Sequence, residues 1–167
     1  MDILPECELN PPQDRGNVLI IRILAIEDDA AVRTLIELIL TKQLPCAKTV
    51  EFAGDWSAAW ALLQRRRYNV VLLDLALPDS SPEETVNRIP EILQHADAVC
   101  VVTGTGERFR EASIAIGAFE YFEKPAIAFE KRRGFIDSIV HAIQRRNPSV
   151  AAQNLIKLKE ALKEQQS

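Results

Sequence analysis

Four short apolar runs punctuate the chain, and each ends in residues that carry a carboxylate, a hydroxyl or an amine. They are Ile21–Ile26 before Glu27, Asp28 and Asp29; Val70–Leu73 before Asp74; Ala98–Val102 before Thr103 and Gly104; and Tyr121–Glu123 before Lys124 and Pro125. Runs that are apolar throughout are typical of strands buried on both faces of a sheet. Longer stretches with apolar residues at helical spacing separate them. This alternation predicts βαβ units, right-handed crossovers and a parallel sheet.

The periodicity predicts five strands alternating with five helices, followed by one extra C-terminal helix. The expected strands cover residues 19–26, 48–53, 70–74, 98–103 and 121–123, and the expected helices cover 30–44, 56–67, 82–93, 107–116, 129–146 and 150–165. Asp29 and Asp55 are suited to cap the first two helices. Ser81 to Glu84 form a capping box with proline at the first helical position.

The length of 167 residues and an apolar content of 47% indicate one folded domain with additions at its ends. We expect a flexible arm over 1–17, the domain over 18–147 and a helical extension over 148–167. Charged residues interrupt the longest apolar run, which excludes a membrane span. The start of the chain is acidic and proline-containing, unlike a signal peptide. The cysteines lack metal-type spacing, so we expect reduced thiols in a cytoplasmic protein.

The acidic residues after the first and third strands predict a metal site. The carboxyl ends of parallel strands meet at one edge of the sheet, where ligands bind. Mg²⁺ takes oxygen ligands, commonly one or two carboxylates plus waters. Asp28 and Asp74 can supply the carboxylates, the main-chain carbonyl of Ala76 a further oxygen, and Glu27 can hold a metal-bound water. The alternative is that the acids after the first strand only cap the following helix, which for Asp29 alone is the interpretation we favour.

Asp74 is also placed to act as a nucleophile. Carboxylates form acyl-phosphate intermediates, and phosphoryl transfer depends mainly on positioning and charge neutralisation. The Lys124 ammonium can neutralise charge, and the Thr103 hydroxyl and Gly104 amide can donate to phosphoryl oxygens. The alternative for Lys124 is an ordinary solvent-facing lysine.

Taken together in this order, the four motifs resemble a response regulator receiver domain, the phosphoacceptor module of two-component signalling, over residues 19–146. The segments that carry the resemblance are Ile26-Glu27-Asp28-Asp29, Leu72-Leu73-Asp74-Leu75-Ala76-Leu77-Pro78, Val101-Val102-Thr103-Gly104 and Tyr121-Phe122-Glu123-Lys124-Pro125. The resemblance implies a flavodoxin-like, doubly wound α/β sheet with strand order 2-1-3-4-5.

The resemblance also implies roles for the site residues. Asp74 would take a phosphoryl group from a phosphohistidine on a sensor histidine kinase or a histidine phosphotransfer protein. Asp28 and Asp74 would bind Mg²⁺ with help from Glu27, and Lys124 would pair with the phosphoryl oxygens. Glu27 departs from the aspartate more common in the family, and its extra methylene moves the carboxylate.

Two further positions bear on switching. Thr103 would move towards the phosphoryl group, and Tyr121 matches an aromatic switch position, although an ordinary strand aromatic explains Tyr121 equally well. Ala76 and Thr105 stand where the family tunes loss of the phosphoryl group, and neither offers an acid or amide to position water. We therefore expect slow self-dephosphorylation at most, and no enzyme activity beyond it.

The expected function is a stand-alone receiver that signals through contacts with a downstream protein target. The residues after Arg146 are too few for an output domain, and no module for direct nucleic-acid binding is evident. The apolar stripe of the last helix predicts docking on a second protomer, on a partner or back onto the domain. The alternatives are an interaction module that never uses the acyl phosphate, and a fragment of a longer protein.

Overall fold

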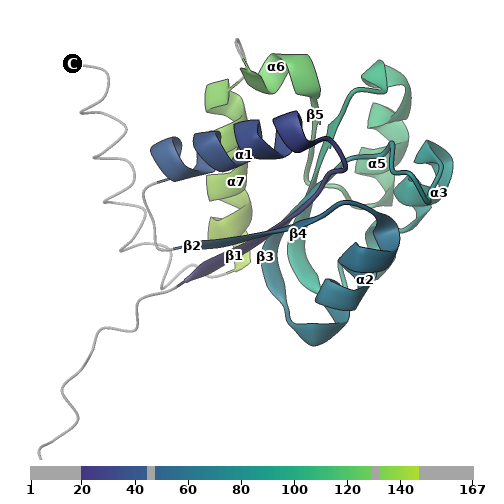
Figure 1. Ribbon diagram of the computed structural model, residues 1–167, viewed down its shortest axis with the longest axis horizontal. Coiled ribbons are helices and arrows are strands. Elements are labelled where there is room, and N and C mark those ends of the chain that lie inside the picture. Colours follow the sequence, from purple (N-terminus) through teal and green to yellow (C-terminus); the bar gives the residue numbers. More distant parts are fainter. Residues whose placement is uncertain (1–19, 45–47, 129–131, 147–167) are drawn as a thin grey trace, which may run out of the picture.

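A computed structural model describes residues 20–44, 48–128 and 132–146, and it shows a five-stranded parallel sheet (Figure 1). The strands are β1 (Ile21–Ile26), β2 (Lys48–Ala53), β3 (Tyr68–Leu73), β4 (Ala96–Thr103) and β5 (Glu120–Glu123). Their order is β2-β1-β3-β4-β5, and each neighbouring pair is parallel. The predicted flavodoxin-like arrangement is confirmed.

Helices cover both faces of the sheet (Figure 1). One face carries α1 (Ala30–Gln43) and α7 (Arg132–Arg146). The other face carries α2 (Trp56–Arg65), α3 (Pro82–Asn87), α4 (Ile89–Ile92) and α5 (Arg110–Ile116). A 3-10 turn, η1 (Gly106–Phe109), comes directly before α5. A short helix, α6 (Lys124–Ala128), follows β5 directly.

The two faces of the sheet build two separate cores. Ile23 and Ala25 of β1 pack with α1 and α7, whereas the alternate residues Leu24 and Ile26 pack with the helices of the other face. All of these side chains are fully buried or nearly so. Burying an aliphatic side chain stabilises the fold by roughly 1.5–3 kcal/mol, so packing on both faces of the sheet holds β1 in place.

Capping residues fix where the helices begin. The Asp29 carboxylate accepts hydrogen bonds from the amides of Ala31 and Val32, and the Asp55 carboxylate accepts one from Ala58. Ser81 forms the predicted capping box with Glu84. The interpretation of Asp29 as a helix cap is confirmed.

Two expected helices differ in form from those in the structure. The helix expected over 82–93 is interrupted at Arg88, because Pro90 has no N–H and its ring crowds the preceding turn. The helix expected over 107–116 opens with the 3-10 turn η1. The expected helix 129–146 is described from Arg132 onward, and α6 was not predicted. The arm expected over 1–17 and the extension over 148–167, with its extra helix, lie outside the described residues.

Strand register brings the polar chain segments together. Ile26 pairs with Leu73 across β1 and β3, so the residues that follow each strand emerge side by side. The Asp74 amide donates to the Ile26 carbonyl at 3.0 Å and extends this pairing by one residue. On the far side of β3, Thr103 of β4 pairs with Glu123 of β5, immediately before Lys124. The sheet therefore presents four functional groups at one edge.

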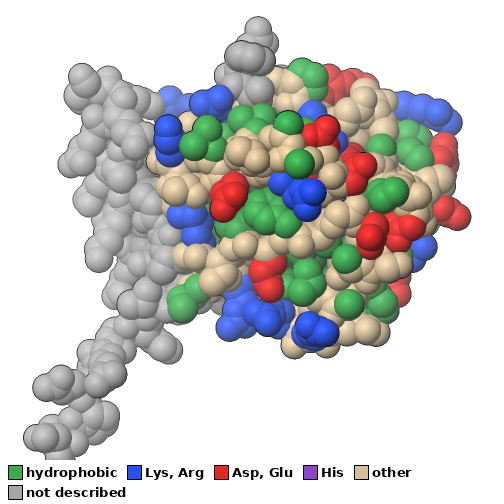
Figure 2. All heavy atoms as spheres, in the orientation of Figure 1, with side chains coloured by type: hydrophobic (Ala, Val, Ile, Leu, Met, Phe, Trp, Pro, Cys, Tyr) green, Lys and Arg blue, Asp and Glu red, His purple; other side chains and the backbone are tan. Residues whose placement is uncertain are grey.

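The surface is mixed in charge. On the face that Figure 2 shows, Lys and Arg side chains are interspersed with acidic and apolar ones over the described part of the chain. Within the described residues, no helix is both long enough and apolar enough to cross a membrane.

Candidate functional site

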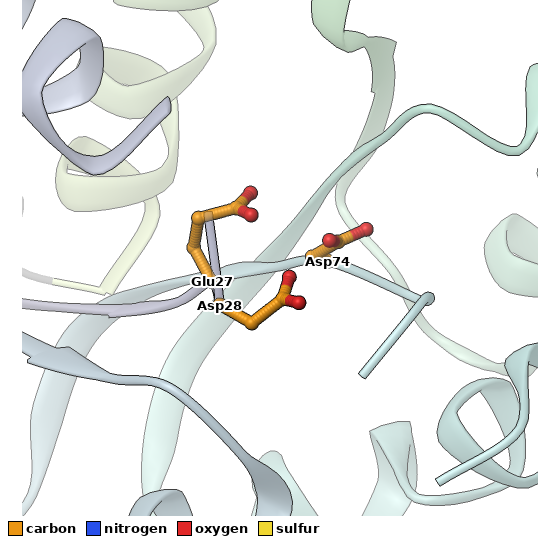
Figure 3. A group of neighbouring side chains, drawn as sticks. All are labelled: Glu27, Asp28 and Asp74. Carbon is orange, nitrogen blue, oxygen red and sulfur yellow. The ribbon is translucent and has the colours of Figure 1, made fainter. Parts of the chain in front are cut away.

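Three carboxylates gather at the carboxyl edge of the sheet, where Glu27 and Asp28 follow β1 and Asp74 follows β3 (Figure 3). One oxygen from each lies within 4.8 Å of those from the other two. Glu27 and Asp74 are only 1% and 2% exposed, whereas Asp28 is open to solvent. Two buried acids and one exposed acid thus lie close together at this edge of the sheet.

Lys124 reaches into this acidic cluster from the end of β5. Its Nζ lies 2.7 Å from Asp74 Oδ2 and 3.0 Å from Glu27 Oε1. Burial lowers the pKa of Lys124, but the hydrogen bonds that it donates to Asp74 and Glu27, together with their negative charges, outweigh burial and raise the pKa. The amine is therefore a cation at neutral pH, and the interpretation of Lys124 as a solvent-facing lysine is wrong.

The second oxygen of Asp74 is held by different donors. Asp74 Oδ1 accepts a hydrogen bond of 2.9 Å from the buried Thr103 hydroxyl and one of 3.2 Å from the Ala76 amide. Gly104 lies beside the same lysine, since a Cβ at Gly104 would meet Lys124 Cδ at 3.9 Å. Each carboxylate oxygen of Asp74 thus has its own donor, and this fixes the plane of the carboxylate.

Glu27 has features that suit a cation nearby. Burial raises the pKa of Glu27, although hydrogen bonds from Lys124 and the Asp29 amide oppose that rise. Its buried Oε2 forms an ion pair with Lys124 Nζ at 2.9 Å. Lys124 shares its single charge between Glu27 and Asp74, and a second cation beside them would balance the remaining negative charge.

The donor set fits a hard divalent cation. Around Asp74, three carboxylates face the single ammonium of Lys124 among the described residues, which leaves an excess of negative charge. Mg²⁺ prefers such oxygen ligands and retains several waters. Asp28 and Ala76 line one surface hollow beside the cluster, so water can reach the site from that side.

A chain of hydroxyl groups leads away from Asp74. Thr105 Oγ lies 3.3 Å from Thr103 Oγ and 3.4 Å from the Tyr121 hydroxyl, which also donates to the Gly106 carbonyl. The Tyr121 ring is buried. The sequence gives no sign of this link through Thr105, because it depends on how three hydroxyl groups are oriented.

Sequence reasoning also missed Asp79, on the loop between β3 and α3 (residues 74–81). Its carboxylate accepts hydrogen bonds from the backbone of Trp56 and Ser57, at the start of α2. An aspartate that follows a proline is typical of a turn, so nothing local distinguishes it.

The sequence matches a known protein family. The sequence model of the family described as response regulator receiver domain matches residues 23–132. The cell cycle response regulator CtrA of Brucella ovis is 29% identical over 127 residues, which is 75% of this chain and 51% of CtrA. The chain spans about half or less of the length of the curated relatives it matches.

Solved structures agree on the fold. A response regulator receiver domain protein from Clostridium thermocellum superposes with a TM-score of 0.62 at 26% identity, covering 75% of this chain and 96% of that one. The receiver domain of the sensor histidine kinase PA1611 from Pseudomonas aeruginosa has a magnesium ion coordinated in its active site cleft. It superposes with a TM-score of 0.56 at 23% identity, covering 72% of this chain and 98% of that one.

Proposed function

We propose, from the premise that this chain belongs to the response regulator receiver family of two-component signalling, that Asp74 accepts a phosphoryl group from a phosphohistidine donor. The observation that carries the proposal is the set of contacts around Asp74. Lys124 holds one carboxylate oxygen, Thr103 and the Ala76 amide hold the other, and two further acids lie alongside. This is the arrangement that a carboxylate nucleophile and a developing phosphoryl charge require.

The transfer forms one bond and breaks another. A carboxylate oxygen of Asp74 attacks phosphorus, a P–O bond forms, the P–N bond of the phosphohistidine breaks, and the imidazole leaves with the electron pair. Lys124 is cationic at neutral pH and lies 2.7 Å from Asp74 Oδ2, where it can neutralise charge on the phosphoryl oxygens. The Thr103 hydroxyl and the Gly104 amide are the proposed donors to the remaining oxygens.

Mg²⁺ is the proposed cofactor. Asp28 and Asp74 would bind it directly with the main-chain carbonyl of Ala76, and Glu27 would hold one of its waters. When bound, the cation neutralises negative charge on the phosphoryl group. The convergence of three carboxylates beside a single ammonium supports this assignment.

The hydroxyl chain offers a route for the signal. Thr103 now donates to Asp74 Oδ1, and Thr105 bridges it to Tyr121. When Thr103 turns towards a phosphoryl group, Thr105 loses a neighbour and the Tyr121 hydroxyl exchanges partners. We propose that this change alters the surface around β5, which a downstream protein or a second copy of the chain then reads.

The proposed partners are a sensor histidine kinase or a histidine phosphotransfer protein upstream and a protein target downstream. The net charge of −4 is unlike the basic character of nucleic-acid-binding proteins and favours a protein target. In this proposal the receiver domain comprises residues 18–147, acts in the cytoplasm and works as a phosphoacceptor switch.

Intact-mass measurement after incubation with acetyl phosphate and Mg²⁺ tests the proposal. The wild type should gain the mass of one phosphoryl group, and Asp74→Asn should gain none. Asp28→Asn should label more slowly, because it lacks one metal ligand. Glu111→Gln, which removes an exposed acid of α5, is the matched control and should label like the wild type. Undiminished labelling of Asp74→Asn would overturn the assignment.

A further inference from the structure

Asp79 joins two parts of the molecule that are separated in sequence. Its Oδ1 accepts a hydrogen bond from the Trp56 amide at 2.8 Å, and its Oδ2 accepts from the Ser57 amide at 3.0 Å and the Ser57 hydroxyl at 3.1 Å. Trp56 and Ser57 begin α2, whereas Asp79 belongs to the β3–α3 loop. One carboxylate therefore spans these two elements with three hydrogen bonds.

The first turn of α2 needs this second carboxylate. The first amides of a helix have no partner within the helix. Asp55, the local cap, accepts from the Ala58 amide at 2.7 Å. Asp79 accepts hydrogen bonds from the two amides that precede Ala58, so Asp55 and Asp79 together cap the first turn of α2. A negative charge at this end of α2 is also favoured by the helix dipole.

Leu75 and Leu77 of the β3–α3 loop are buried in the core, and beyond Asp74 and Asp79 its other hydrogen bonds are to residues close in sequence. The Ala76 amide donates back to Asp74, Leu77 and Ser80 form an isolated bridge, and the Ser80 hydroxyl accepts from Thr85 of α3. Asp79 adds the tie to α2. The loop also contributes Ala76 to the hollow that Asp28 lines.

We infer that Asp79 is a positioning residue that couples the β3–α3 loop to the first turn of α2 and so holds the loop in place for the cation. The inference rests on the proposed function, because it assigns the loop carbonyl of Ala76 to Mg²⁺. Both carboxylate oxygens of Asp79 already accept hydrogen bonds from the start of α2, so its proposed role is to position the loop and not to act as a ligand.

The coupling gives the chain an internal reporter. The Trp56 ring stacks on Trp60 with centroids 5.8 Å apart, and the Arg88 guanidinium lies 4.4 Å from the centre of the Trp56 ring. When metal binding shifts the loop, the hydrogen bond from the Trp56 amide to Asp79 should transmit the shift to Trp56. The tryptophan emission should therefore respond to Mg²⁺.

Calorimetric and fluorescence titrations with Mg²⁺ test the coupling in four full-length proteins. Asp79→Ala should bind Mg²⁺ roughly tenfold more weakly than the wild type, the low end for residues that orient metal ligands. It should also lose the Mg²⁺-dependent change in emission. Two variants are controls. Asp55→Ala removes the other cap of α2. Glu84→Gln removes a negative charge beside the hollow that Asp28 lines but keeps an acceptor for the capping box. Both should bind Mg²⁺ within about twofold of the wild type.

Amide exchange in the metal-free proteins provides an independent readout. Asp79→Ala should accelerate exchange both in the first turn of α2 and in residues 74–81, whereas Asp55→Ala should accelerate it in α2 alone. Wild-type Mg²⁺ affinity in Asp79→Ala, or equal weakening in either control, would overturn the positioning role. Unchanged loop exchange in Asp79→Ala would overturn the coupling. If the wild type binds no Mg²⁺, the metal assignment and the positioning role both fall, and the exchange comparison still decides the coupling.

Discussion

Replacement of Lys124 by methionine should destabilise the protein markedly while preserving the length of the side chain. The change leaves Asp74 and Glu27 buried beside each other without their shared ammonium, which now lies within 3.0 Å of both. Removing one member of a buried ion pair costs about 3–5 kcal/mol. Because the Lys124 side chain is 21% exposed and water reaches it, we expect the low end, about 3 kcal/mol.

The loss should depend on pH in a defined direction. The pKa of Glu27 is already raised by burial in the wild type, and the loss of its hydrogen bond from Lys124 raises it further. A carboxyl group whose pKa is higher in the folded state than in the unfolded state stabilises the fold at low pH. This stabilisation is lost as the pH rises from 4.5, the ordinary pKa of the group, through its pKa in the folded state. Lys124→Met should therefore lose more stability at neutral pH than at pH near 5.

Denaturant unfolding followed by circular dichroism, in the presence of a metal chelator, measures this effect. Lys42→Met is the matched control, because Lys42 is an exposed residue in the last turn of α1. A lysine there contributes about 0.3–1 kcal/mol through the helix dipole. For Lys124→Met, about 3 kcal/mol corresponds to a fall in Tm of roughly 6–12 °C. A loss no larger than that of Lys42→Met, or one that is independent of pH, would refute the reasoning.

Three further results are expected. Gly117→Ala should lower the free energy of unfolding by at least about 1 kcal/mol in denaturant unfolding. The reason is that φ is +124° and the new Cβ would lie 2.9 Å from Leu93 Cδ1, so wild-type stability of the variant would contradict this geometry. Ser81→Ala should cost about 1 kcal/mol in the same assay through loss of the capping box with Glu84, and no loss would show the box to be dispensable. Burial raises the pKa of Cys100 to about 12, so peptide mapping after alkylation at neutral pH should find it modified only in denaturant, and rapid native labelling would contradict its burial.

Much of the site can be predicted from the sequence, because most of its residues directly follow or end a strand. Apolar runs locate the strands, and a parallel sheet places all their carboxyl ends at one edge. The meeting of Asp28, Asp74 and Thr103 follows from that rule and the strand order. Asp29 as a helix cap also follows, since one acceptor next to a helix start is a local pattern.

The remaining features depend on contacts that no local pattern records. Glu27 pairs with Lys124 across 97 positions, and Asp79 reaches the Trp56 amide across 23. Such contacts depend on side-chain rotamers and on the packing of distant elements. By contrast, the interruption of the helix expected over 82–93 could have been predicted from the sequence, because proline disfavours a helix interior and Pro90 lies inside that range.

Chemical mapping of the phosphorylated residue tests the central claim most directly. After incubation with acetyl phosphate and Mg²⁺, borohydride reduces an aspartyl phosphate to the alcohol and leaves homoserine at that position, which peptide mass spectrometry locates. Our account predicts homoserine at position 74 in the wild type and at neither position 28 nor position 29. Homoserine at another aspartate, or phosphorylated protein without any reducible acyl phosphate, would contradict it.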